Sequence, residues 1–152
     1  NTRGESVDNG VKFFEERNLE FSHFLIQDAV RPCLEKEDLD KLLKLLGSEH
    51  DGMILGFPVS DTLKKTHYES SQIIKTVDRN NLWHSQTPQL FKKESLIKAL
   101  NQTSREKEFT DEAQLLESIG ADLVLVKGSS RNIKLTYQDD LKTIKMIIKT
   151  EI

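Results

Sequence analysis

The chain has 152 residues, of which 36% are hydrophobic and 31% charged, and its formal net charge is -3. This length and composition predict one soluble domain with a real core, and no apolar run approaches the length that crosses a bilayer. A pI near 5.8 argues against bulk nucleic-acid binding, and the lone Cys33 cannot form an internal disulfide.

The first predicted elements are a helix and a short strand. Apolar residues at Val7, Val11 and Phe14 predict an amphipathic helix that Ser6 or Asp8 could cap. The aromatic and β-branched run 21–27 then predicts a buried strand that stops at the polar sequence DAVRP.

Ligands in open α/β sheets gather outside the carboxyl ends of strands. Asp28 and Arg31 follow such an end, and Pro32 favours an extended backbone at Arg31. These two residues are therefore candidates for the site. The alternative is structural, in which Asp28 caps a turn and Arg31 pairs with it.

A scaffold of helix and strand follows. Leucines at helical spacing in 35–46, acids at the start and Gly47 at the end predict a second helix. The run 52–59 predicts a second buried strand, and a helix between two strands suggests a βαβ unit with a parallel sheet.

The centre of the chain predicts a projecting β-hairpin. Its halves, DTLKKTH and QIIKTVDR, alternate loosely and are rich in Thr, Ile and Val, with the polar HYESSQ between them. The hairpin gathers four cations in a chain of negative net charge, namely Lys64, Lys65, Lys75 and Arg79. These could face an anionic ligand or a partner subunit, or could simply keep a solvated edge hairpin from aggregating.

The stretch 82–89 reads as a Pro-fixed turn at the base of this hairpin. Trp83 is interpreted as a packing anchor, and Gln86, Thr87 and Gln89 offer neutral hydrogen-bonding groups. The four histidines have no HxxxH or HxH spacing, so a zinc site has little support.

The last third of the chain alternates helices with strands. Helices are predicted over 93–100, from 110 to 119 with Thr110 as N-cap, and over 139–149 with four apolar residues facing the core: Leu141, Ile144, Ile147 and Ile148. Strands are predicted over 122–127 and 132–136. Taken alone, Lys134 in the latter reads as a solvated strand lysine.

Several segments, in order along the chain, closely resemble one enzyme family. DAVRP, PVSDTLKK, TVDRNNLW, QTPQ, FTDEA and NIKLT are similar to the motifs of 2-C-methyl-D-erythritol 4-phosphate cytidylyltransferases, which act in the non-mevalonate isoprenoid pathway. The resemblance implies an α/β, Rossmann-like three-layer nucleotidyltransferase fold with a mostly parallel sheet. It also implies a single domain over 1–152, with 58–82 as a dimerisation arm.

The resemblance further implies the site. Arg31 and Lys134 would be catalytic, and the residues that bind the polyol phosphate would be Asp28, Arg31, Thr62, Arg79, Thr87, Thr110 and Lys134. Thr62 and Arg79 would reach from one subunit of a homodimer into the pocket of the other, and Ser6 would contact the cytosine. CTP and Mg²⁺ held mainly by its phosphates are implied, with no protein residue assigned to the metal. Neither nucleic acid nor a membrane is an expected partner, and the expected compartment is the cytoplasm, or the plastid stroma in a plastid-bearing organism.

The family's glycine-rich loop, which grips the triphosphate, corresponds to residues before Asn1, and NTRGES is too short to replace it. The expectation is therefore an incomplete enzyme. Three alternatives remain open: a ribitol 5-phosphate cytidylyltransferase, a non-catalytic dimerising remnant, and the front half of a fused enzyme.

Overall fold

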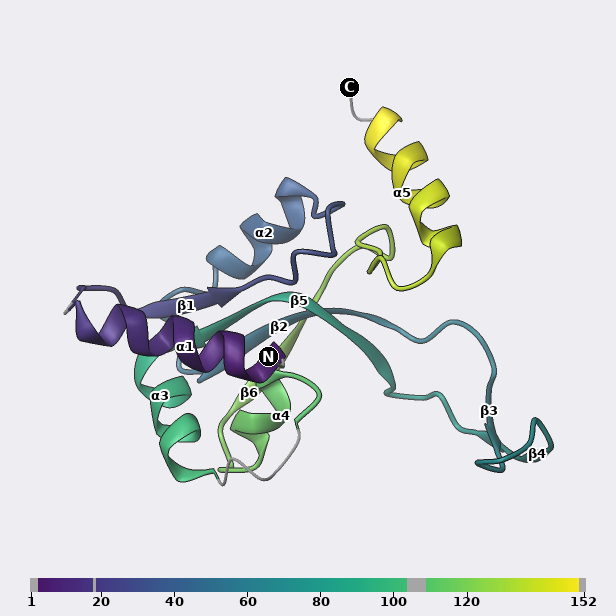
Figure 1. Ribbon diagram of the computed structural model, residues 1–152, viewed down its shortest axis with the longest axis horizontal. Helices are drawn as coiled ribbons and strands as arrows, with labels where there is room; N and C mark the ends of the chain where they lie inside the picture. The colour runs from purple at the N-terminus through teal and green to yellow at the C-terminus, as the bar shows by residue number, and fades with distance from the viewer. Residues whose placement is uncertain (1–2, 18, 104–108, 151–152) are drawn as a thin grey trace.

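The computed structural model describes residues 3–17, 19–103 and 109–150. In chain order its elements are α1 (Arg3–Glu16), β1 (His23–Ile26), α2 (Lys36–Leu43), β2 (Gly52–Pro58), β3 (Leu63–Thr66), β4 (Ile73–Val77), β5 (Trp83–Lys92), α3 (Lys93–Gln102), α4 (Glu112–Glu117), β6 (Leu123–Lys127) and α5 (Gln138–Thr150). Figure 1 shows a central sheet flanked by helices, a hairpin that projects to one side, and α5 standing apart from the sheet.

The four strands of the sheet lie in the order β1-β5-β2-β6. β5 is antiparallel to both β1 and β2, whereas β2 and β6 are parallel, so β1, β2 and β6 run in one direction and β5 alone in the other. The prediction of a mostly parallel sheet holds in this sense. The predicted βαβ unit is only partly right, because β5 separates β1 from β2.

Two apolar cores lie on opposite faces of the sheet. Along β2, Ile54 belongs to the core shared with α1, α3 and α4, while Met53 and Leu55 belong to the core covered by α2. This alternation is the period of two that a strand imposes on its side chains. The result is helices, sheet and helices in three layers, as predicted.

Strand β1 differs from the prediction of a buried strand. It lies at the edge of the described sheet, and the side chain of Leu25 is 45% exposed. An apolar run of four to seven residues does not by itself distinguish an edge strand from a central one.

The prediction of a turn at 82–89 is wrong, because residues 83–89 belong to the ten-residue strand β5 (Trp83–Lys92). Proline normally argues against a central strand because it cannot donate to the ladder. Here the register shifts so that residues 86–88 lie opposite Leu55 alone, which places Pro88 in a bulge after a cis Thr87–Pro88 bond. β2 comes close to β5 just beyond, where a Cβ on Gly56 would lie 2.8 Å from the carbonyl oxygen of His84.

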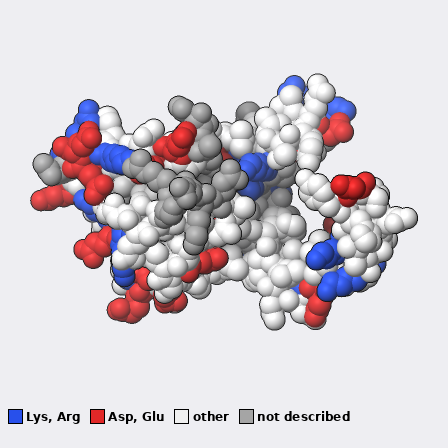
Figure 2. Space-filling model, turned by 60° about the horizontal axis from the view of Figure 1, so that its bottom comes forward, with Lys and Arg blue, Asp and Glu red and all other residues white. Residues whose placement is uncertain are grey.

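The projecting hairpin is confirmed. β3 and β4 pair antiparallel in a sheet of their own, and Figure 1 shows them far from the main sheet. Apolar side chains remain exposed on this arm, with Ile73 at 62% and Ile74 at 47%. Figure 2 shows both basic and acidic side chains on the projecting part.

Helices α2, α3, α4 and α5 lie where the sequence predicts them, but two details differ. Asp111, not Thr110, is the N-cap of α4, since its carboxylate accepts a hydrogen bond from the Gln114 N–H. In α5 only Ile144 is buried, whereas Leu141 and Ile148 are 38% and 39% exposed. The amphipathic pattern predicts a face that packs, and that face is largely uncovered among the described residues.

Two further predictions are wrong, namely that Ser6 caps the first helix and that residues 132–136 form a strand. Ser6 lies inside α1, which begins at Arg3, so it is not an N-cap. Residues 132–136 form a bend and irregular chain without a ladder partner. A backbone hydrogen bond from the Leu135 N–H to the Val30 carbonyl joins them to the loop after β1. Their strand-like composition was therefore misleading.

Candidate functional site

A polar pocket of about 210 Å³ lies where β1 and β5 meet the loops that follow β1, precede α4 and follow β6. Its lining residues are Asp28, Arg31, Ser85, Gln86, Thr87, Gln89, Thr110, Asp111 and Lys134. The position agrees with the expectation that ligands gather beyond the carboxyl end of a strand, here β1. Five predicted site residues are thereby brought together: Asp28, Arg31, Thr87, Thr110 and Lys134.

One end of the pocket holds two cations around one carboxylate. Asp28 Oδ2 lies 3.5 Å from Arg31 Nε and 3.5 Å from Lys134 Nζ. The side chains of Asp28 and Arg31 are 11% and 12% exposed, whereas that of Lys134 is 46% exposed. Two cations outnumber the carboxylate they share, so this end of the pocket can attract an anion such as a phosphate. The structural alternative, in which Arg31 pairs with Asp28, is also correct and is compatible with that role.

Backbone contacts fix the loop that carries Asp28 and Arg31. The Asp28 N–H donates to Thr87 Oγ1 at 2.9 Å, and the Arg31 N–H donates to the Asp28 carbonyl at 3.1 Å. The guanidinium of Arg31 donates from Nη1 to the Asn132 carbonyl at 2.8 Å. The Arg31 side chain is thus held in place from two directions.

The other end of the pocket is built around Asp111. Its Oδ2 accepts hydrogen bonds from Ser85 Oγ and Gln89 Nε2, both at 3.0 Å, while Oδ1 caps α4. Thr110 Oγ1 lies beside it and donates to Gln114 Oε1 at 3.2 Å. This end offers carboxylate, amide and hydroxyl groups, which suit a neutral polyol better than an anion.

Three predicted site residues lie outside this pocket. Ser6 is exposed on α1, Thr62 is exposed before β3, and Arg79 is exposed after β4. Their predicted roles in binding the base and in the partner's pocket stay predictions.

Sequence reasoning missed the pocket roles of Ser85, Asp111 and the buried Asn132. The spacing of Asp111 three residues before Gln114 is an N-cap signal that could have drawn attention to it. Asn132 opens the NIKLT motif, but only Lys134 of that motif was assigned a role, because Asn132 acquires its partners only through the fold.

The described residues contain no group of three or more His, Cys, Asp and Glu side chains that could hold a metal ion. Asp28, the carboxylate at the cationic end of the pocket, already shares its oxygen with Arg31 and Lys134. This end suits an anion better than a divalent cation. No described helix is both long and apolar enough to span a bilayer.

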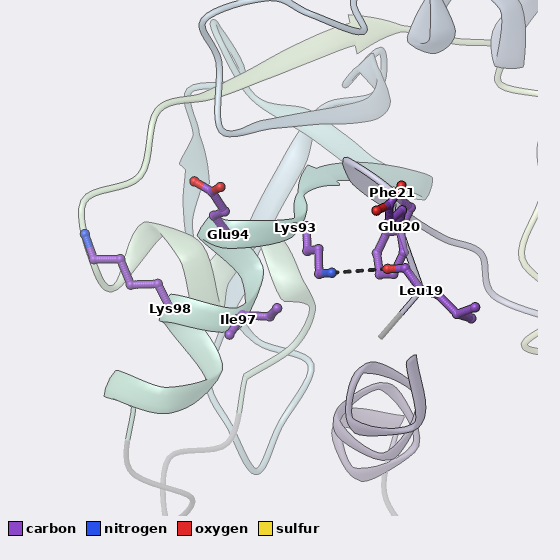
Figure 3. A pocket seen from close by; sticks show the side chains of 7 residues that line it. All are labelled: Leu19, Glu20, Phe21, Lys93, Glu94, Ile97 and Lys98. Carbon is purple, nitrogen blue, oxygen red and sulfur yellow. Dashed lines mark hydrogen bonds between the residues drawn. The ribbon is translucent and has the colours of Figure 1, made fainter. Parts of the chain in front are cut away.

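A second, wider hollow of about 710 Å³ lies between the 19–21 segment and the start of α3, lined by Leu19, Glu20, Phe21, Lys93, Glu94, Ile97 and Lys98. Figure 3 shows Lys93 reaching across it to the Leu19 carbonyl, which it contacts at 3.4 Å. The same ammonium lies 4.3 Å from the centre of the Phe21 ring. Since Lys93 is engaged by the wall of the hollow, the polar pocket is the better candidate site.

Comparison with known sequences gives one consistent family. The family model described as IspD, 2-C-methyl-D-erythritol 4-phosphate cytidylyltransferase, matches residues 1–150. Curated relatives carrying that enzyme's name include one from Neisseria gonorrhoeae (strain NCCP11945), 42% identical over 149 residues, and one from Wigglesworthia glossinidia brevipalpis, 43% identical over 148 residues. Each match covers 97% of this chain but only 64% and 62% of the respective relative.

Solved structures agree with the sequence matches. A crystal structure of 4-diphosphocytidyl-2C-methyl-D-erythritol synthase superposes with a TM-score of 0.87 at 40% identity, covering 97% of this chain and 67% of the other. The Francisella tularensis 2-C-methyl-D-erythritol 4-phosphate cytidylyltransferase gives a TM-score of 0.84 at 30% identity, with coverage of 96% and 68%. The predicted nucleotidyltransferase fold is thereby confirmed.

Proposed function

Because this chain belongs to the 2-C-methyl-D-erythritol 4-phosphate cytidylyltransferase family, we propose that it forms the acceptor side of an enzyme that transfers a cytidylyl group from CTP to 2-C-methyl-D-erythritol 4-phosphate. The products are 4-diphosphocytidyl-2-C-methyl-D-erythritol and pyrophosphate. The observation that carries the proposal is the cluster of Arg31, Lys134 and Asp28 in one polar pocket.

In the proposed reaction a phosphate oxygen of the acceptor attacks the α-phosphorus of CTP. A new O–P bond forms while the bond from the α-phosphorus to the oxygen bridging the β-phosphorus breaks, and that oxygen's electron pair leaves with pyrophosphate. Such a transfer needs orientation and charge stabilisation more than a protein nucleophile. Arg31 and Lys134 would hold the acceptor phosphate, since both are cations at the same end of the pocket.

Neutral and acidic groups would orient the rest of the acceptor. Asp28 can accept a hydrogen bond from a polyol hydroxyl, because a carboxylate has lone pairs beyond those used by its two cationic neighbours. The hydroxyls of Thr87 and Thr110 lie on the same pocket and complete the proposed polyol contacts.

The nucleotide would lie on the side of α1, where the exposed Ser6 would contact the cytosine. Mg²⁺, when bound with CTP, would neutralise charge on the triphosphate, and its ligands would be mainly phosphate oxygens.

We also propose that the chain forms a homodimer through residues 58–82. A two-stranded hairpin is only marginally stable alone, and this one exposes Ile73 and Ile74. An isologous exchange of arms would cover such residues and would bring Thr62 and Arg79 to the partner's pocket.

The curated relatives reported above come from bacteria, which supports the cytoplasm as the proposed compartment. Ribitol 5-phosphate is not favoured as the acceptor, since the family model and these relatives all carry the methylerythritol name.

The test is a pyrophosphate-release assay on the full-length natural protein, with CTP and either 2-C-methyl-D-erythritol 4-phosphate or ribitol 5-phosphate. We expect turnover with the former and kcat/KM at least about 100-fold lower with the latter, because polar groups left unpaired by a wrong acceptor are costly. A preference for ribitol 5-phosphate would overturn the proposed acceptor. Release with neither would overturn the proposed activity.

A further inference from the structure

Lys134 reaches the pocket on a segment that has no regular secondary structure. Residues 128–136 follow β6 as turns and irregular chain, and the Leu135 N–H donates to the Val30 carbonyl at 2.8 Å. Since neither a helix nor a ladder fixes this segment, other contacts must decide where Lys134 lies relative to Asp28.

Asn132 supplies such contacts. Its side chain is fully buried, at 0% exposure, and its Nδ2 donates to the Thr87 carbonyl at 2.8 Å. The backbone carbonyl of Asn132 accepts hydrogen bonds from Arg31 Nη1 at 2.8 Å and from Gln86 Nε2 at 3.2 Å.

Each of these contacts of Asn132 ends on a residue of the pocket. Thr87 in turn accepts the Asp28 N–H through its hydroxyl, so Asn132 is connected to both Asp28 and Arg31. Lys134 follows two residues later, and its ammonium lies 3.5 Å from the Asp28 carboxylate. One buried residue thereby ties three separate segments of the pocket together.

We propose that Asn132 is a positioning residue that sets the placement of Lys134 and Arg31 around Asp28 for the acceptor phosphate. It acts through those residues and does not touch the substrate, because its side chain is buried behind the pocket wall. The inference rests on the proposed function for its role in catalysis, but the positioning itself can be measured without substrate.

The test compares the wild-type protein with Asn132→Ala. Asn132→Ala removes the buried hydrogen bond from Nδ2 to the Thr87 carbonyl and keeps the two that end on the Asn132 backbone carbonyl. Because that loss weakens the docking of residues 132–136, amide hydrogen exchange at Leu135 should become about tenfold faster, while exchange in β2 should stay within about twofold. The KM for 2-C-methyl-D-erythritol 4-phosphate should rise about tenfold and the KM for CTP should change less than threefold.

Ser95→Ala is the matched control. Ser95 donates a hydrogen bond to Asp51 Oδ1 at the far end of the sheet, so its removal also costs one hydrogen bond but leaves the pocket untouched. We expect wild-type KM values and unchanged Leu135 exchange in this variant.

A second variant covers the case in which Asn132→Ala does not fold. Gln86→Met keeps the length of the side chain and removes the donor to the carbonyls of Ser129 and Asn132, so a smaller change in the same direction is expected. If Asn132→Ala folds and its Leu135 amide exchanges at the wild-type rate, the positioning role is overturned. If Asn132→Ala does not fold, a wild-type exchange rate at Leu135 in Gln86→Met overturns it. Equal acceleration of Leu135 and β2 would overturn it too, because it would show only a general loss of stability. If the wild-type protein has no transferase activity, the proposed function is contradicted. The hydrogen-exchange rates of wild type and variants then still test whether Asn132 positions residues 132–136.

Discussion

Lys134→Met separates the charge of Lys134 from its packing, since Met keeps much of the aliphatic stem. A hydrogen bond to a charged group contributes about 1.5–3 kcal/mol. At the effective dielectric constant typical of a protein surface, two unit charges 4 Å apart attract each other by about 4 kcal/mol. Because the Lys134 side chain is 46% exposed, solvent screening places its contribution toward the lower figure. We take about 2 kcal/mol, which corresponds to a loss of about 30-fold in kcat/KM for the acceptor.

The same substitution should hardly affect the fold. An exposed ion pair stabilises by about 0–1 kcal/mol, and Asp28 retains Arg31 as a neighbour when Lys134 is removed. Lys142→Met is a matched control, because Lys142 also pairs with a carboxylate, that of Asp139, but on the surface of α5. We expect wild-type kinetics for the control and similar thermal midpoints for both variants.

The assay is pyrophosphate release as a function of acceptor concentration at saturating CTP, with thermal unfolding measured on the same samples. If Lys134→Met has the kcat/KM of the wild type, Lys134 is a solvated lysine, as its strand-like context alone suggested. If both lysine variants lose activity equally, the effect comes from overall charge and not from the pocket.

Two further predictions concern stability and assembly. The pKa of Asp51 is lowered by the hydrogen bond from Ser95 and by the one from the Asp122 N–H. The contribution of the Asp51 carboxylate to the free energy of unfolding is therefore present above the ordinary carboxyl pKa near 4, and it is lost as the pH falls through the lower folded value. Urea unfolding of wild type and Asp51→Asn should differ at pH 6 and converge toward pH 2, and a difference that stays constant with pH would contradict this reasoning. Arg79→Ala and Lys134→Met are each expected to be nearly inactive alone. If arms are exchanged, mixing the two variants should restore up to about a quarter of wild-type activity, because about half the dimers are mixed and one of the two pockets in each mixed dimer is intact. No restoration despite subunit exchange would argue against shared pockets.

Sequence patterns predicted the elements whose side chains repeat at a fixed period. α2, α3, β2, β6 and the β3–β4 hairpin all lie where apolar spacing and turn residues predict them. Such patterns report how one segment meets a core or solvent, and that information is local. They do not report which strands become neighbours, so the insertion of β5 between β1 and β2 was not foreseen.

β5 shows why local patterns fail at this site. Gln86, Thr87 and Gln89 are all buried, at 3%, 3% and 1% exposure, yet polar residues around a proline predict a turn. They are tolerated inside because partners from distant segments bind them, such as Ser129 for Gln86 and Asp111 for Gln89. These partners are 43 and 22 residues away, so no window of sequence contains both members of either pair.

The candidate site could be predicted mainly through resemblance to the family. From the residues alone, Asp28 and Arg31 stood out by following a strand, whereas Lys134 and Thr110 had ordinary structural explanations, a solvated strand lysine and a helix N-cap. The structure brings these four into one pocket, but it leaves Thr62 and Arg79 on the arm, where a single chain cannot test their role.

Asp28 has a consequence for selectivity in the proposed reaction. A pocket with Arg31 and Lys134 alone would attract any phosphate, including the pyrophosphate product, in a chain whose net charge of -3 otherwise repels anions. The carboxylate between them offsets part of that attraction, so a bare phosphate gains less from entering. A polyol phosphate recovers the difference because one of its hydroxyls donates a hydrogen bond to the same carboxylate. The ion pair that first suggested a purely structural role is therefore also a means of favouring an acceptor that carries both a phosphate and a hydroxyl.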